Sequence, residues 1–262
     1  MDFGFHLVFG FWVLTLNIGY NSMQKNNNEN LIRRTLAIFS LTCCEGCQFA
    51  ILKSFDNFEK LQNFYQIKNF RLGQEENLPG PFDVALIEGT PESEREMKLI
   101  KDVRKNSKIV IALGTCADLG GIQSERNRLP KKYIGREKVK SIHQVIKIDY
   151  TVPGCPIDHK ELFNCLLDLY SGKIFRLPAH GVCFECRENQ NKCLIKDGKP
   201  CLGPVTRAGC NSICVNGGEM CLGCRGALDQ ANFHKLREIL DTMLDEEEIN
   251  NLLTIYGDIE NG

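Results

Sequence analysis

The stretch KIVIALGTCADLGG, residues 108–121, decides the fold class of this chain. Its first part, residues 108–113, is a short apolar run of the kind that forms a buried strand. The run leads directly into GTCADLGG, which places Cys116 in a glycine-rich loop. A buried strand that ends in such a loop is typical of a parallel sheet covered by helices.

Three other runs repeat this pattern. Residues 36–41 (LAIFSL), 82–88 (FDVALIE) and 143–152 (HQVIKIDYTV) are predicted strands, and each is followed by a loop with Gly or Pro. The alternation of strand, loop and helix along the chain predicts an α/β fold with a parallel sheet that is covered on both faces.

Helices are predicted between the strands. Residues 48–64 carry an apolar stripe at helical spacing. Thr90 and Pro91 have the residue types of an N-cap and a first helical position, and the helix that they open runs to about residue 105. Asp158 and Glu161 have capping-box spacing ahead of a helix over residues 162–170.

Four cysteines follow predicted strands by a few residues. The loops at the carboxyl ends of parallel strands gather at one edge of a sheet. We therefore expect these side chains to meet although they are far apart in sequence: Cys44, Cys47, Cys116 and Cys155. Cys165 differs, because it sits among leucines on a predicted helix and has the pattern of an ordinary buried cysteine. The chain has no G-x-G-x-x-G or Walker loop, so this edge is not expected to bind a nucleotide.

Eight more cysteines crowd into residues 183–224, where strand and helix periodicity disappears. Their gaps divide them into two groups. The first is Cys183, Cys186, Cys193 and Cys201; the second is Cys210, Cys214, Cys221 and Cys224. Because the segment offers few large apolar residues, we expect metal clusters to take the place of a hydrophobic core there.

The spacing of the cysteines favours iron–sulfur clusters over zinc. A chain of 262 residues does not need its 14 cysteines for disulfide stability. Four thiolates suit either a structural zinc ion or a [4Fe-4S] cluster. The gaps inside each group are shorter than the usual zinc-ribbon separation of about 15–20 residues, which favours iron. Two zinc knuckles and, with less support, disulfides remain alternatives.

The twelve cysteines of these three quartets are enough for three [4Fe-4S] clusters, with Cys43 and Cys165 left over. No acid, base or nucleophile constellation accompanies them, so the chain is predicted to relay electrons. A formal charge of −1, from 32 basic and 33 acidic residues, gives no field that would gather nucleic acid or an anionic membrane.

The loop motifs resemble those of the small subunits of [NiFe] hydrogenases. The motifs are Cys44-Glu-Gly-Cys47, Gly114-Thr-Cys116-Ala-Asp-Leu-Gly-Gly121 and Pro153-Gly-Cys155-Pro156. They are shared in part with the 20 kDa subunit of respiratory NADH:quinone oxidoreductase. The block that ends in Cys221-Leu-Gly-Cys224-Arg-Gly226 resembles the delta subunit of cytosolic hydrogenases and sulfhydrogenases that couple to NAD(P). The resemblance covers residues 36–228.

The resemblance implies a domain plan and a set of partners. A flavodoxin-like domain, residues 35–177, would hold a proximal cluster against a [NiFe] large subunit that carries the catalytic nickel site. An irregular iron–sulfur domain, residues 178–228, would hold the distal cluster on the first group of four cysteines and the medial cluster on the second. These would lead to a flavin and NAD(P)-binding subunit and to further iron–sulfur subunits. Residues 229–262 are predicted to form a helical tail, with helices capped by Asp229 and Asp245.

The chain departs from the membrane-bound uptake branch of this family at three places. His180 mimics the His-x2-Cys start of a distal cluster, but Cys186 makes that ligand unnecessary. Cys214 restores a fourth ligand where that branch often has proline. Gln48 and Phe49 stand where many members have a glutamate near the second proximal cysteine, which removes support for a proton relay there.

The first 34 residues are predicted to be an apolar segment and a linker. Residues 3–20 form an 18-residue run with few polar side chains, long enough to span a bilayer. No basic residue precedes the run and no small-x-small cleavage site follows it, so it fits a signal peptide poorly. We expect an over-long gene start ahead of Met23 in preference to an anchor, and therefore a cytoplasmic protein without membrane contact.

Other functions remain open from the sequence. An iron–sulfur subunit of a respiratory or heterodisulfide-reductase-linked complex is one, and a zinc-binding interaction module is the non-enzymatic one. The respiratory 20 kDa subunit ends shortly after its PGCP motif, whereas a zinc module would not need the GTC and PGCP loops. The electron acceptor, the direction of electron flow, and the choice of Cys43 or Cys44 as first proximal ligand are also left open.

Overall fold

The computed structural model describes residues 32–53, 55–130, 132 and 138–260. The chain from residue 34 onward forms one compact unit, which holds the sheet and all the cysteines. The apolar run over residues 3–20 lies outside the described residues. No helix within the described ranges is long and apolar enough to cross a membrane.

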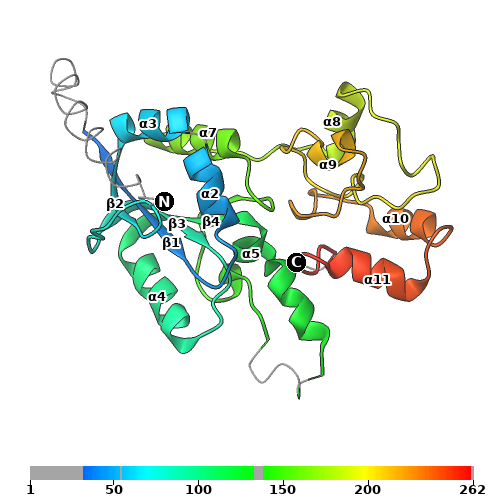
Figure 1. Ribbon diagram of the computed structural model, residues 1–262, viewed down its shortest axis with the longest axis horizontal. Coiled ribbons are helices and arrows are strands. Elements are labelled where there is room, and N and C mark those ends of the chain that lie inside the picture. The colour runs from blue at the N-terminus through cyan, green and yellow to red at the C-terminus, as the bar shows by residue number, and fades with distance from the viewer. Residues whose placement is uncertain (1–31, 54, 131, 133–137, 261–262) are drawn as a thin grey trace, which may run out of the picture. The chain divides into compact units, whose positions relative to one another are not determined.

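A five-stranded parallel sheet forms the centre of this unit (Figure 1). Its strands are β1 (Arg34–Ser40), β2 (Tyr65–Phe70), β3 (Phe82–Glu88), β4 (Ser107–Leu113) and β5 (Tyr150–Val152). They lie in the order β2-β1-β3-β4-β5, which is the order of flavodoxin-like folds. The predicted α/β class and parallel sheet are confirmed.

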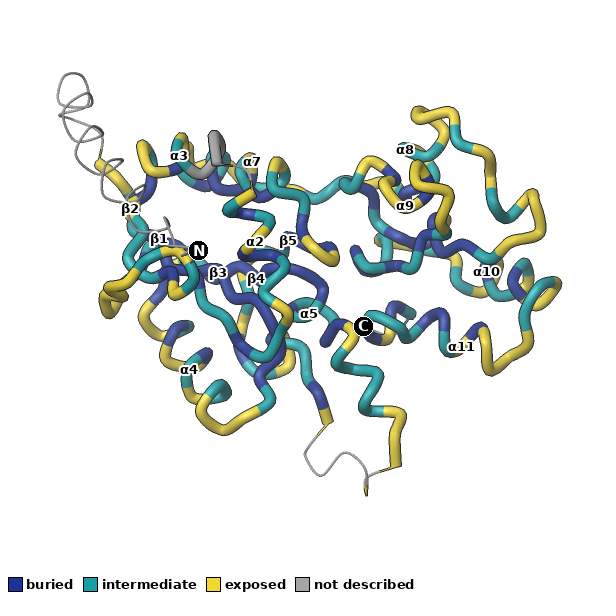
Figure 2. Tube along the Cα trace, viewed as in Figure 1, coloured by how far each residue is buried: buried dark blue, intermediate teal, exposed yellow. Residues whose placement is uncertain are grey.

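Helices cover both faces of the sheet (Figure 1). On one face lie α2 (Gly46–Lys53), α3 (Phe55–Phe64) and α7 (His159–Tyr170), and on the other lies α4 (Glu94–Lys105). Successive strand residues point to opposite faces. Val84 and Leu86 of β3 therefore pack with the first set of helices, while Ala85 and Ile87 pack with α4. Burial on both faces explains why these strands are almost wholly apolar, as the dark blue centre of Figure 2 shows.

The region between the first two predicted strands differs from the prediction. Residues 48–64 were expected to form one helix, but they form α2 and α3, and the strand β2 that follows was not predicted. The sequence of β2, YQIKNF, carries polar residues between buried Tyr65 and Phe70. Such an edge strand has no apolar run by which it could be recognised.

Helix α4 begins later than predicted. Thr90 was expected to be its N-cap, but the amide of Thr90 donates to the carbonyl oxygen of Thr42 at 3.0 Å, which ties this residue to the loop after β1. The N-cap is Ser93, whose side chain accepts from the amide of Glu96 in a complete capping box. The helix therefore spans Glu94–Lys105.

The predicted strand over residues 143–152 is mostly not a strand. Residues Ile142–Gln144 form the short 3-10 helix η2, and only Tyr150–Val152 pair with β4. The buried side chains Ile142 and Ile146 are four residues apart, a helical and not a strand spacing. At Asp149 the backbone amide donates to the carbonyl oxygen of Val110 at 2.9 Å, and the side-chain carboxylate accepts the amide of Val110 at 2.8 Å, so contact with β4 begins at this residue.

The caps predicted at Asp158 and Asp245 are confirmed. Asp158 caps α7, and Asp245 caps α11 (Glu246–Thr254) with a complete capping box. The cap predicted at Asp229 is wrong, because α10 (Phe233–Leu240) begins after Asn232. Asp229 instead binds the Arg207 guanidinium at 2.6 Å.

The cysteine-rich segment shares a small apolar core with the helical tail. It contains two short helices, α8 (Val182–Glu188) and α9 (Ile213–Asn216). Leu202 and Val205 are almost fully buried against Leu236 and Leu240 of α10 and against α11. The expectation of a core without side chains was therefore wrong, since the apolar partners are supplied by the helical tail, later in the sequence.

Candidate functional site

The loops after β1, β4 and β5 bring four cysteines to one edge of the sheet. Cys44 and Cys47 lie before and at the start of α2, Cys116 lies in α5 (Gly114–Leu119) directly after β4, and Cys155 follows β5. Burial, and then the thiols of Cys155 and Cys44, raise the pKa of Cys116 to about 12. The thiols of Cys47 and Cys116 are likewise neighbours. We call these four residues the edge group.

Two glycines let backbone approach the sulfur atoms of the edge group. Gly114 has φ of +79°, and a Cβ there would collide with Sγ of Cys47. Gly121 has φ of +59°, and a Cβ there would lie 2.5 Å from Sγ of Cys116. Both conformations favour glycine. Close backbone approach to thiolate sulfur is what an iron–sulfur site requires, because N–H groups near sulfur tune the cluster. The donor set and its surroundings therefore fit such a cluster.

Glu88 belongs to this edge and was not identified from the sequence. It is the last residue of β3 and is 2% exposed. Its carboxylate accepts the amide of Cys47 at 3.0 Å and the side-chain amide of Gln48 at 3.1 Å. Burial and then this carboxylate raise the pKa of Cys47. A polar residue at the end of an otherwise apolar strand was the signal that could have found it.

The first four cysteines of the cysteine-rich segment lie together. Burial, followed by the thiols of Cys201, Cys186 and Cys193, raises the pKa of Cys183 to about 11. A Cβ on Gly203 would lie 3.3 Å from Sγ of Cys183 and 3.5 Å from Sγ of Cys201, so backbone again faces sulfur. We call this set the outer group: Cys183, Cys186, Cys193 and Cys201.

The last four cysteines are less uniform. Cys224 is close to the thiols of Cys210 and Cys214, and also to Cys155 of the edge group. Cys221 lies between two sets, because its amide donates to Sγ of Cys201 at 3.4 Å while its thiol neighbours both Cys201 and Cys224. We call this set the inner group: Cys210, Cys214, Cys221 and Cys224.

The two leftover cysteines differ from each other. Cys165 is a fully buried residue of α7 in the apolar core, and burial raises its pKa to about 12. Cys43 lies at the sheet edge, where its Sγ is 3.4 Å from the Ser40 hydroxyl and accepts the amide of Glu45 at 3.4 Å. His180 packs on Phe184, with ring centroids 4.6 Å apart.

In the described part of the chain no three His, Cys, Asp or Glu side chains converge on a single point as the ligands of one metal ion do. The thiolates of a [4Fe-4S] cluster bind different irons, so they do not share one point.

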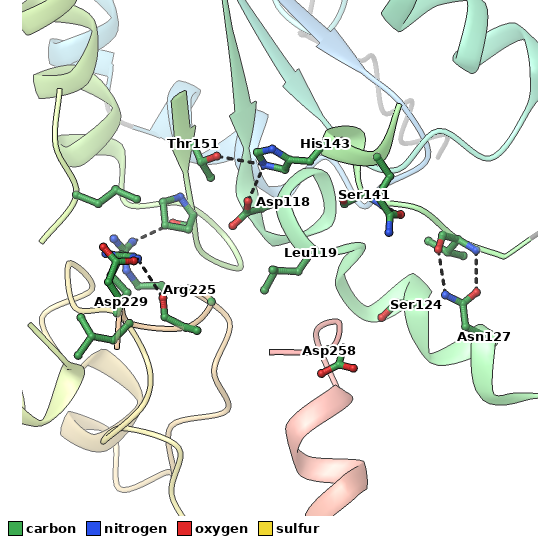
Figure 3. A pocket seen from close by; sticks show the side chains of 18 residues that line it. Asp118, Leu119, Ser124, Asn127, Ser141, His143, Thr151, Arg225, Asp229 and Asp258 are labelled. Carbon is green, nitrogen blue, oxygen red and sulfur yellow. Dashed lines mark hydrogen bonds and ion pairs between the residues drawn. The ribbon is translucent and has the colours of Figure 1, made fainter. Parts of the chain in front are cut away.

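A polar cavity of about 790 Å³ lies where the cysteine-rich segment meets α5. Its wall includes Asp118 and His143, whose Oδ1 and Nε2 atoms are 2.9 Å apart, and also Arg225 (Figure 3). Cys116 lies two residues before Asp118, and Cys224 directly precedes Arg225.

The chain is similar to subunits of hydrogenases. Residues 44–169 match the family model of the NADH ubiquinone oxidoreductase 20 kDa subunit. The delta subunit of sulfhydrogenase 2 from Pyrococcus furiosus is 35% identical over 233 residues, which covers 85% of this chain and 98% of that protein. A subunit of the F420-non-reducing hydrogenase vhu from Methanocaldococcus jannaschii is 32% identical over 238 residues, which covers 75% of this chain and 83% of that protein.

Solved hydrogenase structures share the fold, and one of them serves as the example. It is described as an NAD⁺-reducing [NiFe]-hydrogenase in the H2-reduced state, and its matching chain superposes with a TM-score of 0.52 at 23% identity. The match covers 56% of this chain and 96% of that chain.

Proposed function

Because the chain belongs to the family of [NiFe] hydrogenase subunits that includes the sulfhydrogenase delta chain and its relative in the vhu hydrogenase, we propose that it relays electrons through three [4Fe-4S] clusters. The relay would run between a nickel–iron large subunit and a flavin subunit that reacts with NAD(P). The catalytic nickel site is then on a partner chain, and this chain is a subunit of an oxidoreductase.

The observation that carries the proposal is the meeting of four cysteines from separate loops at one sheet edge, with glycine backbone against their sulfur atoms. The edge, inner and outer groups each supply four thiolates. Bound there, a [4Fe-4S] cluster would accept and release one electron at a time. The chain's own residues would hold each cluster, exclude water and set its potential through burial and N–H donors.

The positions of the groups support one order along the relay. Cys224 of the inner group neighbours Cys155 of the edge group, and Cys221 neighbours Cys201 of the outer group. We therefore place the inner group between the other two. In the terms of the family, the edge group would be proximal, the inner group medial and the outer group distal.

Two exposed apolar side chains support contact between the sheet edge and the large subunit. Phe49, two residues after Cys47, is 56% exposed, and Ile122, six residues after Cys116, is 58% exposed. Large exposed apolar side chains beside a functional site are typical of protein interfaces. The domain boundaries at residues 34, 177 and 228 and a cytoplasmic location stay predictions.

Metal analysis tests the proposal. Anaerobically purified protein should contain about twelve iron atoms and about twelve acid-labile sulfides per chain, because three groups of four cysteines each complete a cubane. Zinc in place of iron would reject the relay and favour an interaction module. A nickel-containing large subunit that co-purifies with the chain would support the proposed partner.

A further inference from the structure

Two side chains, Arg225 and Thr115, join the cysteine-rich segment to the sheet, and we call them the seam. Arg225 follows Cys224 directly, and its side chain is 1% exposed. Its Nη1 donates to the carbonyl oxygen of Pro153 at 2.9 Å, in the loop that carries Cys155 (Figure 3). Arg225 therefore adjoins an inner-group cysteine in sequence and is hydrogen-bonded to a loop of the edge group.

The orientation of Arg225 is fixed by its remaining contacts. Its Nη2 donates to both carboxylate oxygens of Glu161, at 2.7 and 3.0 Å, and its Nε donates to the carbonyl oxygen of Ala208 at 2.9 Å. Glu161 lies in the first turn of α7, which follows the Cys155 loop. Because all three nitrogen atoms of the planar guanidinium donate hydrogen bonds, the side chain cannot rotate as an exposed arginine can.

Thr115 makes the second connection. It precedes Cys116, is 1% exposed, and donates its hydroxyl to the carbonyl oxygen of Cys224. Its amide donates to the carbonyl oxygen of Gly154 at 3.0 Å. One buried residue thus contacts the backbone of an inner-group cysteine and the loop of an edge-group cysteine.

We propose that Thr115 and Arg225 are positioning residues that give electrons a hydrogen-bonded route between the edge group and the inner group. This inference rests on the proposed function. One branch runs from Cys116 through the Thr115 hydroxyl to the carbonyl of Cys224. The other runs from Cys155 back to the Pro153 carbonyl and through Arg225 to Cys224.

The transfer along this route is a one-electron step. When dihydrogen is oxidised on the partner chain, a cluster held by the edge group would pass one electron to a cluster held by the inner group. No covalent bond forms or breaks, and no proton moves along the seam. Burial of the seam keeps water from replacing these hydrogen bonds.

A pair of substitutions at Thr115 tests the route in the purified complex. Thr115→Val keeps the volume but removes the donor, whereas Thr115→Ser keeps the donor. In the dithionite-reduced complex, the magnetic splitting between the paramagnetic clusters of the edge and inner groups reports their coupling. We expect Thr115→Val to weaken this splitting and to slow reduction of the inner group by hydrogen. Thr115→Ser should retain both, with equal iron content in all three proteins.

Arg225 needs a control, because its removal leaves Glu161 buried without a partner. Arg225→Lys keeps the charge but cannot reach all three acceptors, so it should also weaken the splitting. Arg237→Gln is the control for loss of an arginine–carboxylate pair elsewhere, because Arg237 binds Glu260 at 2.6 Å on the more exposed tail, away from the sheet edge. An equal loss of splitting in Arg237→Gln would mean general loosening and would overturn the proposal.

Failure of the seam and failure of the relay give different results. Wild-type protein without iron would reject the proposed function itself. Full iron content in Thr115→Val with unchanged splitting and unchanged reduction rate would reject only the seam. Loss of iron in Thr115→Val would also overturn the seam, since Thr115 would then support cluster binding instead of coupling.

Discussion

At the scale of single residues, the sheet edge combines thiols with a buried carboxylate. Glu88 binds the amide of Cys47 and the side chain of Gln48, so it orders the first loop of the edge group. Gln48 therefore has a structural partner at the place where many relatives of the uptake branch carry a glutamate. The two residues that follow Cys47 carry no carboxylate, and Glu88 at the end of β3 places one against the Cys47 amide.

The cysteines of the edge group and the leftover cysteines should respond differently to substitution. Cys116→Ser should remove about four iron atoms per chain, because a cubane that loses a thiolate ligand is not retained. Cys165→Ser should leave the iron content unchanged, since Cys165 packs in the apolar core. Iron and sulfide analysis of the anaerobic proteins measures both.

Cys43→Ser should also leave the iron content unchanged. Cys43 is the sequence neighbour of Cys44 and lies at the same edge, so it is the strictest control for the assignment of ligands. If Cys43→Ser lost iron and Cys44→Ser did not, the first ligand of the edge group would be Cys43.

Phe49 tests whether the sheet edge contacts the large subunit. Phe49→Asp should weaken the complex by about 2 kcal/mol, or about thirtyfold in Kd, because it places a charge in an apolar contact. Ile174→Asp is the control: Ile174 is 68% exposed but adjoins Phe175, which packs on Tyr150 at the amino end of β5. Co-purification of the large subunit measures both, and equal loss would contradict the proposed interface.

At the scale of elements, one carboxylate connects three strands. Asp83 of β3 accepts the amide of Thr35 of β1 at 2.7 Å and the Nζ of Lys108 of β4 at 2.7 Å. Burial acts to raise the pKa of Asp83, but the hydrogen bonds from Lys108 and Thr35 outweigh it and hold the pKa below its ordinary value. The Lys108 side chain is 80% exposed, so the bonds to Thr35 contribute most of the stability.

Asp83→Asn should destabilise the protein in a pH-dependent way. A carboxyl group with a lowered folded-state pKa contributes stability that is present above its unfolded pKa and is lost as pH falls through the folded pKa. We expect a loss of about 1 to 2 kcal/mol in the free energy of unfolding at pH 7, shrinking below about pH 4. Urea unfolding followed by circular dichroism measures it.

Asp197→Asn is the control for this pH dependence, because Asp197 is an exposed carboxylate in the cysteine-rich segment. We expect acid to release iron from all variants alike, so the difference between variants isolates the contribution of Asp83. A difference between wild type and Asp83→Asn that stayed constant from pH 7 to about pH 3 would contradict the assignment.

At the scale of the whole molecule, the three groups of cysteines are arranged in series. The inner group neighbours both others, and the seam holds it against the sheet. Loss of a cluster from the outer group and loss of a cluster from the edge group should therefore affect the reactions of the partner chain differently.

Cys186→Ser should interrupt the outer end. Hydrogen-dependent reduction of NAD(P) should fall, whereas hydrogen/deuterium exchange at the nickel site should persist because it needs no long-range electron transfer. Cys116→Ser should disturb the sheet edge and weaken both activities. Equal loss of isotope exchange in the two variants, with the complex still assembled, would contradict the order of the groups.

The sequence by itself determined the α/β class, four of the five strands in part or whole, and the edge at which Cys44, Cys47, Cys116 and Cys155 gather. It could do so because strands buried on both faces must be apolar, and because parallel strands all end at the same edge. The caps at Asp158 and Asp245 were also predictable, since an N-cap side chain binds an amide only three residues further along the chain.

Only the tertiary structure decided the features that depend on partners distant in sequence. Thr90 does not cap α4 because Thr42 binds it, and at the start of β5 the amide of Val110 is bound by the side chain of Asp149 and not by a backbone carbonyl. The position of Cys221 beside Cys201 and the burial of Arg225 against Pro153 follow from packing of the two parts of the chain. Local pattern carries no signal for such contacts, because each is set by the folded position of a residue far along the chain.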